Sequence, residues 1–259
     1  MDRLLKELGP DEQKGSKPRC HWLTHGAPEE VAGRLSALAE PWGFVSAEDS
    51  WMPEGFCQTE EAQMDKAWRL LPPVQEREAL RKWWLAVPGG NVRTPTWDIA
   101  STLTIDGRKG FLLVEAKAHT GELKTEDRVK AGPANLERIA RCIKEANSSL
   151  SVWTGHTWAL SHEHYYQMAN RFAWSWKLTQ LGYPVVLVYL GFLGADEMRE
   201  GRDQVPFACH ADWKDLVKYR SKKLFPAAVW DRRWWVGDQP FIPRVCSMTI
   251  RHDGPIKEE

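Results

Sequence analysis

The stretch TWDIASTLTIDGRKGFLLVEAKAH, residues 96–119, predicts two β-strands joined by a tight turn. Apolar and polar side chains alternate along the first arm, and the second arm opens on a short apolar run typical of a buried strand. Between the arms stands Asp106-Gly107, a strong signal for a two-residue hairpin turn. The remainder of the chain is interpreted around this hairpin.

Three ionisable side chains of the hairpin are predicted to share one face of the sheet. Glu115 and Lys117 lie two residues apart, so their side chains point the same way. With the turn centred on Asp106-Gly107, Asp98 falls opposite Glu115. A turn centred one residue later puts Asp98 opposite Lys117. Either register brings Asp98 to the face of the other two, provided that no bulge intervenes.

Two carboxylates and an ammonium group at this spacing fit two interpretations. The Cβ atoms of opposed residues lie about 4.5–5.5 Å apart, and two carboxylates so close repel each other unless a cation lies between them. A hard dication such as Mg²⁺ or Mn²⁺ prefers oxygen ligands, lowers the pKa of bound water and stabilises charge on a phosphate oxygen. The lysine would then orient or deprotonate the attacking water. The other interpretation is a structural Asp–Lys–Glu cluster at the end of a hairpin.

Asp98 on one strand, followed by Glu115-Ala116-Lys117 after an apolar strand, resembles the motif of the PD-(D/E)XK nuclease superfamily, which has the restriction-endonuclease-like fold. The resemblance implies that Asp98, Glu115 and the backbone carbonyl of Ala116 bind Mg²⁺ or Mn²⁺. It also implies a catalytic role for Lys117. Trp97 stands where the family name has proline, and the resemblance covers roughly residues 76–193.

The implied fold is an α/β structure with an α+β mixed sheet, in the order helix–strands–helix–strand. We expect this core over residues 56–225, preceded by a helical N-terminal extension over residues 1–55. Residues 226–259 contain tryptophan and proline and are expected to form a C-terminal tail that packs on the core. The continuous apolar run at residues 185–193 predicts a central strand covered on both faces.

The superfamily often adds an acidic residue from a helix that precedes the motif strands. Glu76 is the candidate for this further metal ligand, on a helix predicted over residues 74–87. Glu61 is its competitor, on a helix predicted over residues 59–71. For both glutamates the alternative is a solvated position on the helix surface. The first strand of the family's meander is not obvious, and residues 83–87 are one candidate for it.

Further catalytic and substrate-binding candidates lie after the hairpin. Some branches of the superfamily carry a glutamine on the next helix, and Gln167, on a helix predicted over residues 161–181, matches loosely; a surface glutamine is the alternative. His119, on the face of Lys117, can shuttle a proton or contact phosphate. The basic candidates for substrate binding are Arg171, on the same side of that helix as Gln167, and Lys222 with Lys223.

Composition narrows the possible partners. The chain has 259 residues with 35 basic and 35 acidic side chains, so any attraction of nucleic acid must come from a local patch. Fifteen tryptophans favour core packing, with base stacking as the alternative. Five scattered cysteines indicate reduced thiols. The sequence shows neither a signal-peptide core nor an apolar run long enough to cross a bilayer, which predicts a cytoplasmic protein without a membrane partner.

Together these features predict a metal-dependent nuclease that hydrolyses phosphodiester bonds, with DNA as the expected substrate. The alternative is a catalytically silent nucleic-acid or protein interaction module on the same scaffold. The intact Asp, Glu and Lys favour the enzyme, and the zero net charge favours the module. The sequence does not indicate an oligomeric state.

Overall fold

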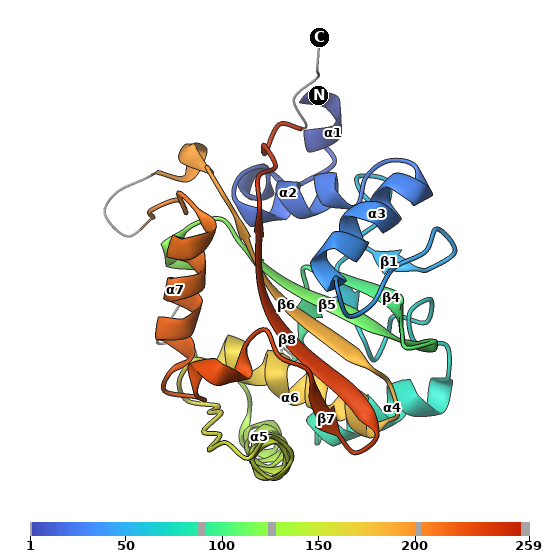
Figure 1. Ribbon diagram of the computed structural model, residues 1–259, viewed down its shortest axis with the longest axis vertical. Helices are drawn as coiled ribbons and strands as arrows, with labels where there is room; N and C mark the ends of the chain where they lie inside the picture. The colour runs from blue at the N-terminus through green and yellow to red at the C-terminus, as the bar shows by residue number, and fades with distance from the viewer. Residues whose placement is uncertain (1, 88–91, 124–127, 200–203, 255–259) are drawn as a thin grey trace.

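The computed structural model describes residues 2–87, 92–123, 128–199 and 204–254. Within these residues, six strands form one mixed sheet in the order β1-β4-β5-β6-β8-β7 (Figure 1). Neighbouring strands β5, β6 and β8 are parallel, and β1, β4 and β7 are antiparallel to their partners. The strands are β1 (Trp51–Met52), β4 (Ile99–Ile105), β5 (Arg108–Lys117), β6 (Val185–Phe192), β7 (Trp234–Val236) and β8 (Gln239–Met248).

Helices cover both faces of this sheet (Figure 1). On one face, α2 and α3 pack over Leu112 and Val114 of β5. On the other face, α4, α5, α6 and α7 contribute to the core that contains Phe111 and Leu113. The helices are α1 (Asp2–Leu5), α2 (Ser16–Leu23), α3 (Pro28–Ala39), α4 (Val74–Trp84), α5 (Pro133–Thr154), α6 (Tyr166–Gln180) and α7 (His210–Ser221), with short 3-10 helices η1 (Pro10–Glu12), η2 (Thr120–Glu122), η3 (Asp196–Met198) and η4 (Ala227–Val229).

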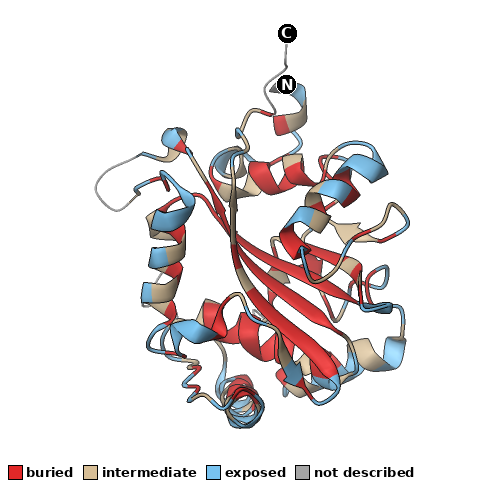
Figure 2. Cartoon of the chain, viewed as in Figure 1, coloured by how far each residue is buried: buried red, intermediate tan, exposed pale blue. Residues whose placement is uncertain are grey.

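The protein is therefore a mixed α/β structure, as predicted, and the order helix, hairpin, helix, buried strand is present as α4, β4–β5, α6 and β6. Strand β6 is buried along its whole length between β5 and β8 (Figure 2). Tryptophan serves mainly as core filler: Trp84, Trp97, Trp174 and Trp213 are among the largest fully buried side chains.

The central hairpin has the first of the two registers considered from the sequence. Ile105 pairs with Arg108, so Asp106 and Gly107 form the turn. Both have positive φ angles, 49° and 75°, which is the requirement of a two-residue turn that follows the strand twist. Because Ile99 pairs with Val114, the same register continued by one residue sets Asp98 opposite Glu115.

The helix predicted over residues 59–71 is wrong. Ala62–Gln63 forms β2, which pairs with β3 (Thr96–Trp97) in a separate two-stranded sheet, and turns follow it. Met64 is buried as expected for a core position, but Trp68 is 66% exposed. The turns that follow β2 thus bury only some of the apolar residues that have helical spacing in the sequence, and no helix forms.

The helix predicted over residues 74–87 ends earlier, at Trp84. The Asn135 side-chain oxygen accepts hydrogen bonds from the N–H groups of Ala86 and Val87, at 2.8 and 3.0 Å. These donors are therefore satisfied outside a helix, and the backbone becomes extended at Leu85. Residues 83–87 are not the first strand of the meander, because β4 pairs with β1 instead.

The predicted division into extension, core and tail does not follow the sheet. Strand β1 comes from the predicted extension and pairs with β4, and β8 comes from the predicted tail and pairs with β6 over eight residues. Two prolines within β8 make this strand difficult to predict from the sequence. Pro240 precedes the first pair with β6. Pro243 accepts a hydrogen bond from Asp231 N–H at 2.8 Å, so its backbone faces away from β6 and its missing N–H is tolerated.

Gly110 of β5 lies close against the backbone of Pro184, and we expect Gly110→Ala to destabilise the protein. A Cβ at this position would lie 2.2 Å from the Pro184 carbonyl oxygen, which is held by Phe111 N–H at 2.8 Å. Because the obstacle is backbone, we expect a loss of about 1–3 kcal/mol in the free energy of unfolding, measured with urea.

Gly33 provides the matched control for that substitution. It lies within α3, and a Cβ there meets nothing within 4 Å. Gly33→Ala should therefore stabilise the protein by up to about 1 kcal/mol, since alanine has the higher helix propensity. Equal stability of Gly110→Ala and the wild type would contradict the account of this contact.

Candidate active site

Asp98, Glu115 and Lys117 meet on one face of the sheet, where β4 begins and β5 continues beside β6. Glu115 and Lys117 alternate with Ala116, so they share the face of Phe111 and Leu113. Asp98 reaches the same face, and its Oδ2 accepts a hydrogen bond from Ala116 N–H at 2.7 Å. The predicted convergence of the three side chains is confirmed.

Glu115 is 1% exposed, and both of its carboxylate oxygens are held by cations. Lys117 Nζ donates to Oε1 and Arg171 Nε donates to Oε2, the latter at 2.6 Å. Arg171 comes from α6, donates to the Thr96 carbonyl oxygen at 2.6 Å, and lies over the Trp97 ring at 4.8 Å. The guanidinium thus fixes Glu115 to both α6 and β3.

Arg171, which was predicted to bind substrate, holds Glu115 in place and also lines the cavity beside Asp98. The side chain is buried, and it donates hydrogen bonds to Glu115, to the Thr96 carbonyl and to Asn170 Oδ1. Its charge is used to neutralise Glu115, so Arg171 is a positioning residue. The sequence signal for its location was its place four residues after Gln167, which puts both side chains on one side of α6.

The two carboxylates of the cluster have opposite pKa shifts. Burial, followed by the charges of Glu115 and Glu61, raises the pKa of Asp98 to about 7, although Lys117 opposes the shift. Burial would also raise the pKa of Glu115, but the charges of Arg171 and Lys117 outweigh it, and the pKa is lowered. Of these two carboxylates, Asp98 is therefore the one whose negative charge is less fully neutralised by nearby cations.

Burial would lower the pKa of Lys117, but the charges of Glu115 and Asp98 outweigh that effect and raise it. The side chain is therefore an ammonium group at neutral pH. An ammonium donates hydrogen bonds and neutralises negative charge, and it has no lone pair with which to accept a proton. The sequence left two roles open for Lys117, which could orient the attacking water or deprotonate it. The protonated state favours the first role.

Glu61 is the candidate acid that the structure places beside Asp98. The antiparallel pairing of Ala62 with Trp97 sets the preceding residue, Glu61, opposite Asp98 at the end of the β2–β3 sheet. Glu61 and Asp98 line the same cavity, and Lys17 Nζ lies 3.1 Å from Glu61 Oε1. The acid therefore comes from a short strand pair and not from a helix.

Glu76, the first candidate for that acid, lies elsewhere. Its Oε2 accepts a hydrogen bond from the Tyr183 hydroxyl at 2.6 Å, and the Tyr183 ring packs against Phe111 with a centroid distance of 5.0 Å. Phe111 is near the start of β5, whereas Glu115 is near its end. Glu76 therefore lies toward the opposite end of the strand, and the structure does not bring it to Asp98, where it was predicted to bind metal.

Gln167 lies in the first turn of α6 and reaches the predicted site. It lines the same cavity as Asp98, which has a volume of about 390 Å³. The cavity is open to solvent, so a substrate group can approach Asp98 from outside. Its lining residues are Glu61, Arg93, Pro95, Thr96, Asp98, Tyr166, Gln167, Asn170 and Arg171.

His119, Lys222 and Lys223 are not among those lining residues. His119 is buried, and its Nδ1 accepts a hydrogen bond from Gly121 N–H at 3.2 Å, so the ring caps the η2 turn. Lys222 and Lys223 are exposed at the end of α7, where the Lys222 ammonium lies 3.9 Å from the centre of the Tyr219 ring. None of these three predicted substrate-binding residues lines the cavity beside Asp98.

Comparison of the chain with protein-family models, curated proteins and solved structures found no match. The described residues contain no group of three or more His, Cys, Asp or Glu side chains arranged to hold a metal ion. A search of the described helices found none with the length and apolarity needed to span a bilayer.

The raised pKa of Asp98 has a consequence for stability that can be measured. The folded protein holds the Asp98 proton up to about pH 7, whereas the unfolded chain releases it near pH 3.8. The folded state thus binds more protons in this window, so its stability should fall as pH rises through it. Relative to Asp98→Asn, the wild type should lose about 1–4 kcal/mol between pH 4 and pH 8, followed by urea unfolding at each pH. A constant difference across this range would contradict the assignment.

Proposed function

We propose that this protein is a nuclease that hydrolyses phosphodiester bonds of nucleic acid, with DNA as the expected substrate and Mg²⁺ or Mn²⁺ as the cofactor. The observation that carries the proposal is the convergence of Asp98, Glu115 and Lys117 on one face, next to an open cavity. A second acid, Glu61, and the amide of Gln167 line that cavity. Carboxylates for a hard cation, together with a lysine, are the groups that this hydrolysis requires.

The architecture supports the same proposal. The acidic residue precedes β4, the Glu-Ala-Lys sequence ends β5, and α6 then leads into the parallel strand β6. This order is the one that the resemblance to a restriction-endonuclease-like core predicts, and β1 would then be the first strand of the antiparallel meander. The proposal thus rests on the topology as well as on the motif.

The oxygen atoms of this cluster are of the type that a hard dication prefers as ligands. Asp98, Glu115 and the Ala116 carbonyl would hold it. Because Ala116 N–H points to Asp98, the carbonyl of the same strand residue lies toward the same edge. Burial and neighbouring carboxylates already disfavour the charge on Asp98, and a dication would relieve that effect. Binding requires the Lys117 ammonium to leave Glu115 Oε1. The bound ion would supply a more acidic water and charge neutralisation at phosphate.

The chain's own residues have separable roles in this proposal. Lys117, protonated in the resting structure, orients the attacking water and neutralises charge that develops on the phosphate oxygens. Arg171 keeps Glu115 in place while Lys117 moves, because its hydrogen bonds to Thr96 and Asn170 do not depend on Lys117. Gln167 offers an amide from the α6 wall of the cavity, where it can bind the substrate or the water.

One observation favours the alternative, a catalytically silent interaction module. Both Glu115 oxygens are already satisfied by Lys117 and Arg171, so the ion cluster is complete in itself. Such a cluster can be purely structural. The module has no need of a metal ion, whereas the nuclease does.

A cleavage assay separates these two functions. Purified protein should be incubated with Mg²⁺, Mn²⁺ or EDTA and with circular or linear, single- or double-stranded DNA and RNA. We expect strand cleavage with either metal and none with EDTA. Binding of an oligonucleotide without cleavage of any substrate would favour the interaction module and overturn the nuclease.

A further inference from the structure

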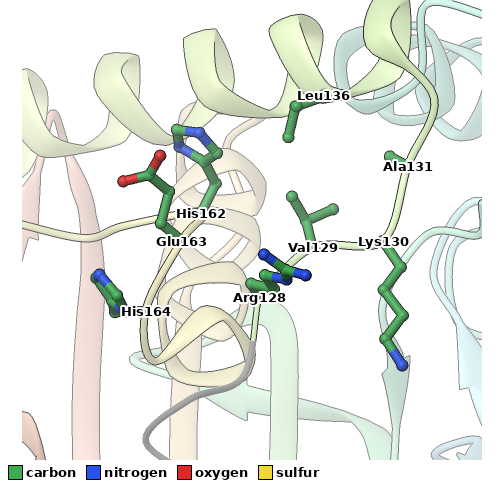
Figure 3. Close-up of a pocket in the computed structure, with 8 residues that line it drawn as sticks. All are labelled: Arg128, Val129, Lys130, Ala131, Leu136, His162, Glu163 and His164. Carbon is green, nitrogen blue, oxygen red and sulfur yellow. The ribbon is translucent and has the colours of Figure 1, made fainter.

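A second, larger cavity of about 940 Å³ lies beside α5 (Figure 3). One wall is residues 128–131, which lead into α5, and the other is residues 162–164, which lead into α6. A hydrogen bond from Val129 N–H to the His162 carbonyl oxygen, at 3.0 Å, joins the two walls. Leu136 of α5 extends into the space between them (Figure 3). The walls are therefore connected to each other and to the first turns of two helices.

Four of the eight side chains that line this cavity are arginine, lysine or histidine. Arg128 and Lys130 are exposed and carry permanent charge, and His162 and His164 add two imidazoles. Glu163 is the single carboxylate among the lining residues, and Figure 3 shows it directed away from Arg128. The acid cavity, which is the cavity beside Asp98, is lined by two carboxylates, Glu61 and Asp98, and by the guanidinium groups of Arg93 and Arg171.

The two cavities are lined by neighbouring stretches of chain at the start of α6. The cationic cavity ends at His164, and Tyr166 and Gln167 line the acid cavity, two and three residues later. A ligand bound across the start of α6 would therefore contact both. The whole chain has a net charge of zero, so a polyanion can be held only where cations gather locally, and its further phosphates need counter-charge away from the acids.

We propose that the cationic cavity binds the sugar-phosphate backbone of the nucleic acid next to the bond that is cut. This inference rests on the proposed nuclease function, and it assigns Arg128 and Lys130 as the residues that contact phosphate. His162 adds a donor from the opposite wall. The contacts are to the backbone, so they determine affinity and position and carry no sequence preference.

The test is a charge reversal, Arg128→Glu with Lys130→Glu, examined by fluorescence anisotropy with labelled single- and double-stranded oligonucleotides in EDTA. We expect the Kd to rise at least about tenfold in low salt. Loss of two phosphate contacts should also make the plot of log K against log salt shallower by about 1.8 for duplex or about 1.4 for single strands. The neutral pair Arg128→Gln with Lys130→Gln should give an intermediate loss.

Arg3 and Lys6 supply the matched control. Arg3 is exposed on α1 (Figure 1), Lys6 is exposed directly after that helix, and their double reversal to Glu makes the same change in net charge. Its affinity should remain within about twofold of the wild type. An equal loss in this control would show a general charge effect and would overturn the assignment of the cationic cavity.

The outcomes also separate this inference from the nuclease proposal. If the wild type binds but never cleaves, and the Arg128 and Lys130 reversal weakens binding, the cavity assignment stands without the nuclease. If the wild type cleaves and the reversal changes neither Kd nor KM, the cavity assignment is overturned while the nuclease stands. Failure of the wild type to bind any oligonucleotide overturns the cavity assignment directly.

Discussion

Asp98→Asn and Lys117→Met are each expected to lower the rate of DNA cleavage in Mg²⁺ by roughly a thousandfold. Asp98→Asn removes a carboxylate that the metal requires, and Lys117→Met removes the ammonium that orients water and neutralises the phosphate. Asparagine and methionine are nearly isosteric with aspartate and lysine, so the sheet should be retained in both variants. Initial rates of cleavage of circular DNA, measured with folded protein, report the loss.

Lys109→Met is the matched control for the lysine variant. Lys109 lies on the same strand, β5, but near the other end, where it pairs with Asp49 at 2.7 Å and is 63% exposed. Its replacement should leave the rate within about twofold of the wild type. Cleavage at wild-type rates by purified Asp98→Asn or Lys117→Met would contradict the proposed catalytic roles.

Glu115→Ala is expected to have the largest effect on stability, a loss of about 3–5 kcal/mol. The substitution leaves the buried charges of Lys117 and Arg171 without the carboxylate that both of them bind. Removal of one partner of a buried ion pair costs more than replacement of the pair, because the remaining charge is desolvated and uncompensated. Urea unfolding monitored by circular dichroism measures this loss.

A double variant tests the physical reason. Glu115→Ala with Arg171→Met removes one of the two orphaned cations, so its loss should be smaller than the sum of the two single losses. Strict additivity would show that the buried charges do not interact as described. A loss below about 1 kcal/mol for Glu115→Ala alone would contradict the account in the same way.

Asp98→Asn should behave differently from Glu115→Ala in stability as well as in activity. Its folded-state charge is disfavoured, since the pKa is raised to about 7. Replacing it with a neutral amide should therefore stabilise the protein above pH 7 while abolishing cleavage. A residue whose removal improves stability and destroys activity is kept for function, which is the pattern expected of an active-site acid.

The hairpin and its three ionisable side chains could be predicted because the signals are local. Alternation along β4 sets which side chains share a face, and Asp106-Gly107 fixes the register of the turn. From these two features, the position of Asp98 opposite Glu115 follows without knowledge of the rest of the fold. The structure confirms this geometry, and the metal and the reaction remain proposals.

What the sequence did not reveal depends on long-range pairing. Strand β1 is two residues long, and β8 contains two prolines, so neither has a strong local pattern. Glu61 is brought to Asp98 only by the pairing of β2 with β3, across more than thirty residues of chain. The end of α4 depends on the side chain of Asn135, which lies about fifty residues later. Such contacts are made by tertiary structure and leave no periodicity to detect.

Calorimetric titration of Mn²⁺ into the wild type, Asp98→Asn and Lys117→Met tests most directly whether this cluster holds a hard dication. The wild type should bind the ion, and Asp98→Asn should lose most of the affinity. Lys117→Met should bind more tightly than the wild type, because the ammonium that competes for Glu115 is gone. Absence of binding in all three proteins, or equal affinity of Asp98→Asn and the wild type, would contradict the account.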